Sequence, residues 1–188
     1  MKIGFAFCGS FCTFAPAIEQ LEHFYDLGHE IVPIMSFNAS SIDTRFGKAA
    51  DHISKIESIC GRSVIKTIPD AEPLGPKEKL DMLIICPCTG NTLAKMALGI
   101  TDTPVTMAAK AHLRCDRPLL IALATNDGLS ANLSNLNAMQ KRKSVYFVPL
   151  TQDDPEKKPH SLVCDFTKLS ESFYAALRGE QLRPLFLN

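Results

Sequence analysis

The chain has 188 residues, of which 46% are hydrophobic and 21% charged, and this composition predicts one globular domain, residues 1–188, with a substantial buried core. Twenty basic and twenty acidic residues give a net charge of zero, which argues against a dedicated nucleic-acid-binding or membrane-surface protein. No apolar run approaches the ~20 residues that span a bilayer, and no signal pattern opens the chain, so we expect a cytoplasmic protein.

The first part of the chain alternates apolar runs of strand length with helical patterns. Thr13 is the expected N-cap of the first helix, and Gly28 and Gly61 are expected to end the first two helices. Prolines and charges at residues 69–79 predict a loop that lies on the surface or folds over a ligand. The expected strands are residues 2–8, 30–35 and 64–68, and the expected helices are residues 14–27 and 45–60.

Five apolar residues, 82–86, have the length and β-branched content of a strand that is buried on both faces. We expect Pro87 to end this strand and a helix to follow from Thr92. Residues 151–160 are charged and contain prolines, so they are expected to be exposed. The remaining expectations are helices at 105–113, 129–139 and 167–182, a strand at 118–124 and a final strand at 145–148.

This alternation predicts an α/β fold in which helices cover both faces of a parallel sheet. Four short polar loops follow predicted strands, at residues 9–13, 36–40, 87–92 and 125–128. Each loop alone has the composition of an ordinary helix cap. Because parallel strands bind ligands at their carboxyl ends, however, the four loops are expected to meet in one binding site.

The chemistry of these loops suits an anion, because hydroxyl groups, backbone N–H groups and helix N-termini converge there. No Gly-x-Gly-x-x-Gly spacing or Walker lysine is present, which favours one terminal phosphate over a pyrophosphate. The candidate cofactor-binding residues are Gly9, Ser10, Phe11, Thr13, Ser36, Asn38, Pro87, Cys88, Thr89, Gly90, Asn91, Thr92, Thr125 and Asn126.

The seven cysteines are expected to be reduced thiols, since no secretory signal is present. Cys86 and Cys88 flank one proline, and Cys8 and Cys12 straddle a strand end. Neither spacing is that of a zinc site or a redox pair. We therefore expect no metal site.

Gly9 and Ser10 after the first strand, Ser36 after the second, and residues 87–102 (PCTGNTLAKMALGITD) resemble the homo-oligomeric flavin-containing cysteine decarboxylase superfamily. The motif of that superfamily reads Pro-Ala-Ser/Thr-Ala-Asn-Thr-x-x-Lys-x-Ala-x-Gly-x-x-Asp, and the resemblance extends over nearly the whole chain. It implies a flavodoxin-like (Rossmann-like) three-layer α/β/α fold and FMN bound between the subunits of a trimer or a multiple of trimers. The residues that it implies near the cofactor are Gly9, Ser10, Ser36, Asn91 and Thr92.

The sequence also departs from the superfamily pattern. Cys88 and Gly90 stand where the motif has alanine. Residues 72–77 lack the catalytic histidine that the decarboxylases carry before the central strand, and residues 124–127 replace their Pro-Ala-Met-Asn motif. Without that base and substrate clamp, we reject the decarboxylase alternative. A prenyl-FMN synthase-like transferase shares the fold, but we find no cluster of Arg and Lys near Ser36 to support it.

Within the superfamily, the chain length and residues 9–15 (GSFCTFA) most resemble the flavoprotein component of a two-component oxidoreductase of endospore-forming bacteria. That resemblance implies oxidation of a dihydropyridine dicarboxylate, with a partner protein that binds NADP. The alternative is a noncatalytic scaffolding component with an empty flavin fold. His52 and His112 are candidate proton acceptors, but a lone histidine on a helix is more often structural, and no catalytic residue is assigned. The candidates for binding the substrate carboxylates are Arg45, Lys48, Lys110 and Arg114.

Overall fold

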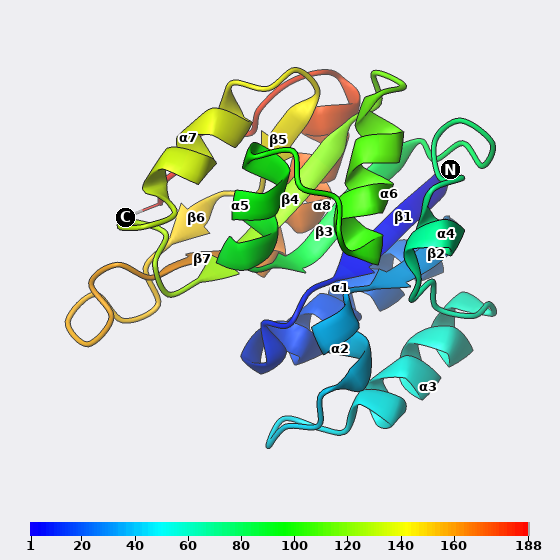
Figure 1. The fold of residues 1–188 in the computed structure, drawn as a ribbon. Helices are drawn as coiled ribbons and strands as arrows, with labels where there is room; N and C mark the ends of the chain where they lie inside the picture. Colours follow the sequence, from blue (N-terminus) through cyan, green and yellow to red (C-terminus); the bar gives the residue numbers. More distant parts are fainter. Residues whose placement is uncertain (188) are drawn as a thin grey trace.

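A seven-stranded sheet forms the middle layer of the computed structural model, which describes residues 1–187 (Figure 1). The strand order is β2-β1-β3-β4-β7-β6, and β5 pairs with the first half of β4. Strands β1 to β5 are parallel, whereas β7 runs antiparallel to β4 and β6. The strands are β1 Lys2–Phe7, β2 Glu30–Met35, β3 Met82–Cys88, β4 Leu119–Thr125, β5 Val145–Phe147, β6 Leu150–Thr151 and β7 Leu162–Cys164. The expected α/β fold with a mostly parallel sheet is confirmed.

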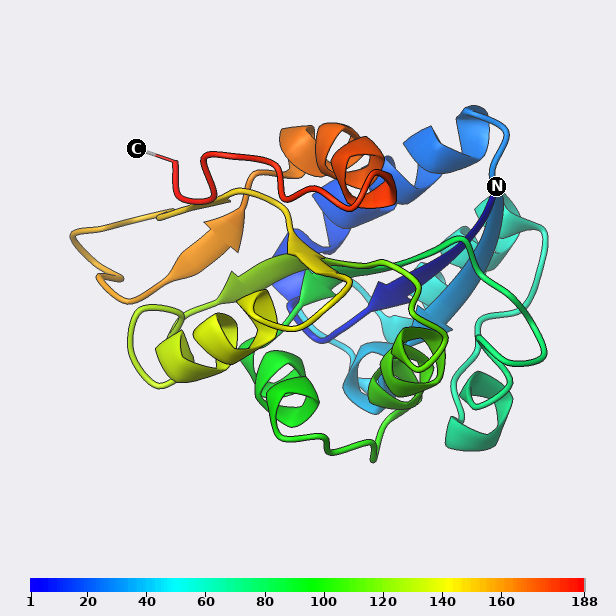
Figure 2. The same ribbon diagram turned by 90° about the horizontal axis from the view of Figure 1, so that it is seen from above.

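Helices cover both faces of the sheet, so the fold has three layers (Figure 2). One face is covered by α1 (Phe14–Asp26) and α8 (Leu169–Leu177). The other is covered by α5 (Gly90–Ala97), α6 (Pro104–Leu113) and α7 (Leu133–Gln140). The remaining elements are α2 Phe37–Ser41, α3 Ala49–Cys60, α4 Ile68–Ala71 and the 3₁₀ turns η1 Phe11–Thr13 and η2 Phe166–Lys168.

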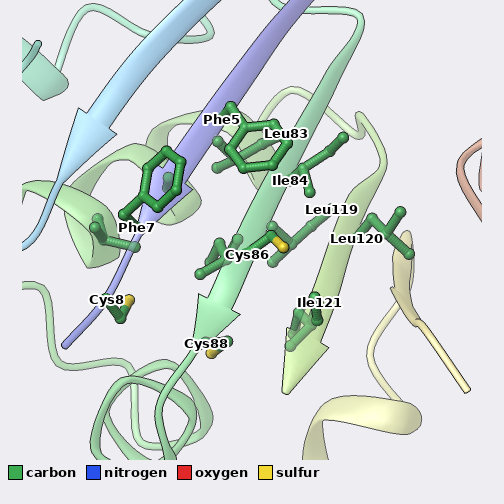
Figure 3. Packing of buried hydrophobic residues seen from close by; sticks show 14 of the residues in the cluster. Phe5, Phe7, Cys8, Leu83, Ile84, Cys86, Cys88, Leu119, Leu120 and Ile121 are labelled. Carbon is green, nitrogen blue, oxygen red and sulfur yellow. The ribbon is translucent and has the colours of Figure 1, made fainter. Parts of the chain in front are cut away.

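The hydrophobic core lies on both sides of β1, β3 and β4 (Figure 3). All seven residues of β3 are buried, as a strand covered by helices on both faces must be. Phe5 and Phe7 of β1 pack with their rings 5.2 Å apart, and Phe7 in turn contacts Phe14 of α1. These aromatic contacts pack α1 against β1.

Several boundaries differ from the sequence-based expectations. Residues 64–68 form no strand, because the Thr67 hydroxyl caps α4 within this segment. Ile65 makes only one isolated bridge, to Ile34. Strand β3 does not end at Pro87 but continues to Cys88 through a register shift after Ile85, an irregularity of the kind that accommodates proline.

Other differences concern helix ends and the end of the sheet. Thr13 occupies the N-cap position of α1, as expected, but its side chain makes no capping hydrogen bond, because its hydroxyl donates to the Ser10 carbonyl at 2.8 Å instead. Helix α3 begins at Ala49 rather than at residue 45, and α8 ends at Leu177 rather than at residue 182. Strand β5 is not the final strand, since the short strands β6 and β7 follow it.

Residues 69–79 lie at the edge of the sheet where the strands begin. The Glu78 carboxylate forms an ion pair with Lys2 at 2.8 Å, beside the first residue of β1. Gly75 packs against the backbone of Ala111 near the end of α6, so closely that a β-carbon would lie 2.3 Å from the carbonyl oxygen. Of the two alternatives for this segment, a surface connection or a fold over a ligand, its contacts with Lys2 and α6 favour the connection, since they place it at the start of the strands.

Candidate functional site

A cleft of about 1020 Å³ opens at the carboxyl edge of the sheet. Three of the four polar loops that the sequence singles out contribute to its wall, and they follow β1, β3 and β4. The hairpin before α3 and the segment around β7 complete it. The lining residues are Gly9, Ser10, Phe11, Cys12, Thr13, Thr44, Arg45, Phe46, Thr89, Gly90, Asn91, Ala124, Thr125, Asn126, Asp127, Asp153, Lys158 and Val163.

Backbone hydrogen bonds between neighbouring strands bring the loops to the same level. The amide of Cys8 donates to the carbonyl of Pro87 at 3.0 Å, and the amide of Ser36 donates to the carbonyl of Phe7 at 2.9 Å. The Thr92 hydroxyl donates to the Cys8 sulfur at 3.2 Å, which joins the start of α5 to the end of β1. The loops after β1 and β3 are therefore held together by the sheet itself.

Small hydroxyl groups line the part of the cleft formed by the loops after β1 and β3. The Thr13 hydroxyl donates to Ser10 Oγ at 3.1 Å, and both residues line the cleft. Thr89 caps α5 by accepting a hydrogen bond from the Thr92 amide at 3.3 Å. Asn91 lies in the first turn of α5 and is exposed. These groups can donate hydrogen bonds to an anion beside the N-terminus of α5.

Ser36 and Asn38, which the sequence predicts in the site, are not among the residues that line the cleft. The Ser36 side chain is buried, and its hydroxyl caps α2 by accepting from the Ala39 amide at 3.3 Å. Asn38 lies behind Gly9, where a β-carbon on the glycine would be 3.5 Å from that of Asn38. Ser36 therefore caps α2, whose residue Asn38 lies beside Gly9.

Pro87, Cys88 and Thr92 are also outside the cleft wall, although they adjoin it. Cys88 is buried at the end of β3, and burial raises the pKa of its thiol well above the usual value. The Cys8 thiol is buried beside it (Figure 3). Two buried thiols packed under the loops act as small hydrophobic residues.

The loop after β4 carries a fixed carboxylate, that of Asp127. The Thr125 hydroxyl donates to it, and Asn132 Nδ2 donates to both carboxylate oxygens at 2.9 Å. The hydrogen bond from Thr125 is the main cause that lowers the pKa of Asp127 below its usual value. Gly90 packs directly on this network: a β-carbon there would lie 2.5 Å from Thr125 Oγ1 and Asn132 Nδ2.

The cations predicted to bind carboxylates are dispersed. Arg45 lines the cleft, whereas Lys48 immediately precedes α3 outside it. Lys110 lines a separate cavity of about 170 Å³ between α5 and α6, and Arg114 follows α6 close to the start of β4. Sequence reasoning missed a cation, Lys158, which reaches the cleft from the loop between β6 and β7.

Lys158 is held in an ion pair by Asp153, with Nζ and Oδ2 2.6 Å apart. This contact raises the pKa of Lys158 and lowers that of Asp153, so both groups are charged at neutral pH. Both residues belong to a segment that the sequence marks only as exposed and charged. No spacing in the sequence connects that segment to the loops after β1, β3 and β4.

Neither histidine candidate reaches the cleft. His112 is fully buried, its Nε2 lies 2.8 Å from the Pro118 carbonyl, and burial lowers its pKa to about 4. The His52 ring packs edge-on against Phe14, with centroids 5.0 Å apart. Both rings are parts of the packing, and neither lines the cleft.

Residues 1–187 contain neither a metal cluster nor a membrane-spanning helix. In that part of the chain, no group of three or more His, Cys, Asp or Glu side chains could hold a metal ion. No helix there has the length and apolar character needed to cross a bilayer.

Comparison with known proteins gives one consistent relationship. Residues 1–173 match the Flavoprotein family. The chain is 42% identical to the B subunit of dipicolinate synthase of Bacillus subtilis (strain 168) over 186 residues, which are 99% of this chain and 93% of that protein. The crystal structure of the same B subunit from Bacillus halodurans superposes with a TM-score of 0.91 at 38% identity, covering 100% of this chain and 96% of the other.

A more distant structure shares the fold. The dodecameric FMN-dependent Ubix-like decarboxylase from Escherichia coli O157:H7 superposes with a TM-score of 0.64 at 21% identity, covering 79% of this chain and 80% of that one. At this identity the likeness concerns the fold alone. The two B subunits of dipicolinate synthase, in contrast, match this chain over nearly its full length. This chain therefore belongs to the Flavoprotein family and is a homologue of the dipicolinate synthase B subunit.

Proposed function

We propose that this chain acts with a nicotinamide-binding partner, the A subunit of dipicolinate synthase, to oxidise dihydrodipicolinate to dipicolinate (pyridine-2,6-dicarboxylate). The observation that carries the proposal is the match to the B subunit along nearly the whole chain, at 42% identity. The designation of that relative as a B subunit supports the existence of a companion A subunit. We place this activity in the cytoplasm of the mother cell of a sporulating bacterium.

The cleft suits a small dicarboxylate of this kind. Aromatising the ring removes a hydride and a proton, while the two carboxylates of the substrate require positive partners. Arg45 lines the cleft and forms no ion pair within residues 1–187, so it can supply such a charge, whereas Lys158 in the same cleft already pairs with Asp153. Phe11, Phe46 and Val163 provide apolar surface for a flat ring in the same cleft. The combination of a few polar groups with apolar walls is typical of a ligand site.

The cleft also has a donor set that fits FMN. Hydroxyl groups of Ser10, Thr13 and Thr89 and the amide of Asn91 lie along the wall next to the start of α5. Such neutral donors at a helix N-terminus suit a terminal phosphate. We propose that they hold the phosphate of FMN, which when bound would provide a two-electron acceptor in addition to NADP on the partner protein.

We further propose that the chain is a homo-oligomer, a trimer or a multiple of trimers. The relative from Escherichia coli O157:H7 is dodecameric. In this chain, three large apolar side chains are exposed on α2 and the hairpin that follows it, next to the cleft: Phe37 at 45%, Ile42 at 42% and Phe46 at 46%. Exposed apolar groups that gather in one place are typical of association surfaces.

Reconstitution tests the proposal. The purified chain is mixed with the A subunit, dihydrodipicolinate and NADP, each component is omitted in turn, and dipicolinate formation is followed. We expect product only when both proteins are present, and a yellow chain that releases FMN on denaturation. A colourless chain that still stimulates the A subunit would favour the scaffolding alternative. If the chain made no difference, the assignment would be wrong.

A further inference from the structure

Asp127 places a negative charge in the wall of the cleft. It lines the cleft together with Arg45, Asp153 and Lys158. Asp153 is neutralised by Lys158, but among residues 1–187 no Lys, Arg or His side chain forms an ion pair with Asp127. The groups that hold its carboxylate, Thr125 and Asn132, are neutral donors. Its negative charge is therefore left to interact with whatever occupies the cleft.

The orientation of this carboxylate is fixed by a buried amide. Asn132 is only 6% exposed, and its Nδ2 donates to both oxygens of Asp127. Its own oxygen accepts a hydrogen bond from Asn135 Nδ2 at 2.9 Å, so both ends of the amide are engaged and the donor end faces Asp127. Because the Thr125 hydroxyl donates to Oδ1 as well, Oδ1 accepts two hydrogen bonds and Oδ2 accepts one. A carboxylate oxygen accepts two, so Oδ2 retains a free position for a ligand.

Gly90 packs directly against this hydrogen-bond network because glycine has no side chain. A β-carbon at this position would lie 2.9 Å from Asp127 Oδ1, in addition to its contacts with Thr125 and Asn132. The start of α5 can pack this closely only because residue 90 is glycine. Gly90 at the start of α5 and Asn132 at the start of α7 thus fix the carboxylate between them.

We propose that Asp127 is the catalytic residue that stabilises positive charge on the ring and accepts its proton during oxidation, with Thr125 and Asn132 as positioning residues. This proposal rests on the proposed function. One ring C–H bond breaks and its electron pair leaves with the hydrogen as hydride, which goes to the nicotinamide or flavin acceptor. A second ring hydrogen leaves as a proton to Asp127 Oδ2. The ring becomes aromatic, and the carboxylic acid then releases its proton to water.

The electrostatics of the site agree with this role. As hydride departs, the ring develops positive charge, and an ionised carboxylate in contact with it lowers the energy of that state. The lowered pKa of Asp127 keeps it ionised at neutral pH. A cationic, pyridinium-like ring is itself acidic, so it can transfer its proton even to a weak base.

Activity of the reconstituted pair tests this role through Asp127→Asn, which keeps the shape of the side chain but removes its charge. We expect kcat to fall by about 10²-fold or more, as is common when a general base is lost, while dipicolinate binding to the variant is retained. The matched control is Asp116→Asn, an exposed aspartate beyond the end of α6, which should leave activity unchanged. Full activity of Asp127→Asn in an active wild-type assay would overturn this role alone, whereas an inactive wild-type pair would overturn the proposed function.

A pH profile separates positioning from a merely structural effect. Thr125→Val and Asn132→Ala each remove hydrogen bonds that lower the pKa of Asp127. The acidic limb of the kcat/KM profile should therefore move to higher pH in both variants. An unmoved limb in variants that fold and bind dipicolinate would contradict the assignment of the titrating group to Asp127.

Discussion

Replacing Gly90 by alanine tests the packing that forms the floor of the cleft. The added methyl group would lie 2.5 Å from both Thr125 Oγ1 and Asn132 Nδ2, closer than carbon approaches such atoms in folded proteins. Overpacking of this kind costs about 1–3 kcal/mol. Alanine regains up to about 1 kcal/mol of helix propensity over glycine, although the gain is smaller in a first turn. We therefore expect a net loss of about 1–2 kcal/mol in the free energy of unfolding.

Thermal unfolding followed by circular dichroism measures this loss. For a chain of this size, a loss of about 1–2 kcal/mol corresponds to a Tm lowered by about 2–8 °C. Gly9→Ala is the matched control, because its β-carbon would meet its nearest neighbours at 3.5 Å, an ordinary contact. Asn132→Ala should partly relieve the strain, so the double variant Gly90→Ala/Asn132→Ala should lose less than the sum of the single losses. A Gly90→Ala protein as stable as the parent would refute the inferred contact between α5 and the loop after β4.

Three further predictions separate groups in the cleft from groups outside it. Arg45→Ala should raise the KM for the dicarboxylate by about 10-fold or more, because it removes a charge-assisted hydrogen bond. The control Lys48→Ala should change the KM less than about twofold. Equal effects of the two variants in steady-state kinetics would contradict the placement of the two cations. Ser36→Ala should lower the free energy of unfolding, measured with urea, by about 1 kcal/mol because the α2 cap is lost. Its affinity for FMN in a fluorescence titration should stay unchanged, and a selective loss of that affinity would show that Ser36 takes part in binding FMN. The folded-state pKa of His112, about 4, lies below its ordinary value of 6.5, so the unfolded chain takes up a proton first as the pH falls. The stability that neutral His112 contributes is thus complete above pH 6.5 and is lost towards pH 4, by about 2 kcal/mol at pH 5 relative to pH 7; urea unfolding should show this loss, and His112→Asn should abolish that component.

The sequence predicts the central sheet well, because β1 to β4 are apolar runs whose burial leaves a local pattern. It does not predict β6 and β7, which have two and three residues and depend on pairing with distant parts of the chain. Residues 64–68 show the opposite case, since their β-branched composition is overridden by the cap that Thr67 provides to α4.

The candidate site divides in the same way. Gly9–Thr13, Thr89–Asn91 and Thr125–Asn126 were predicted to meet because the carboxyl ends of parallel strands share one edge. That rule does not say which way a side chain points, and Ser36 was therefore predicted to lie in the cleft although its hydroxyl caps α2. Lys158 and the contact of Gly90 with Asn132 arise from tertiary packing between segments that are far apart in the sequence.

A crystal structure of the chain with dipicolinate and FMN would test the central claim most directly. We expect both ligands in the cleft between Gly9–Thr13 and Asp127, with a carboxylate of dipicolinate within hydrogen-bonding distance of Arg45 and the ring beside Asp127. Binding instead in the groove between α7 and Phe186, or in the cavity beside Lys110, would contradict the account.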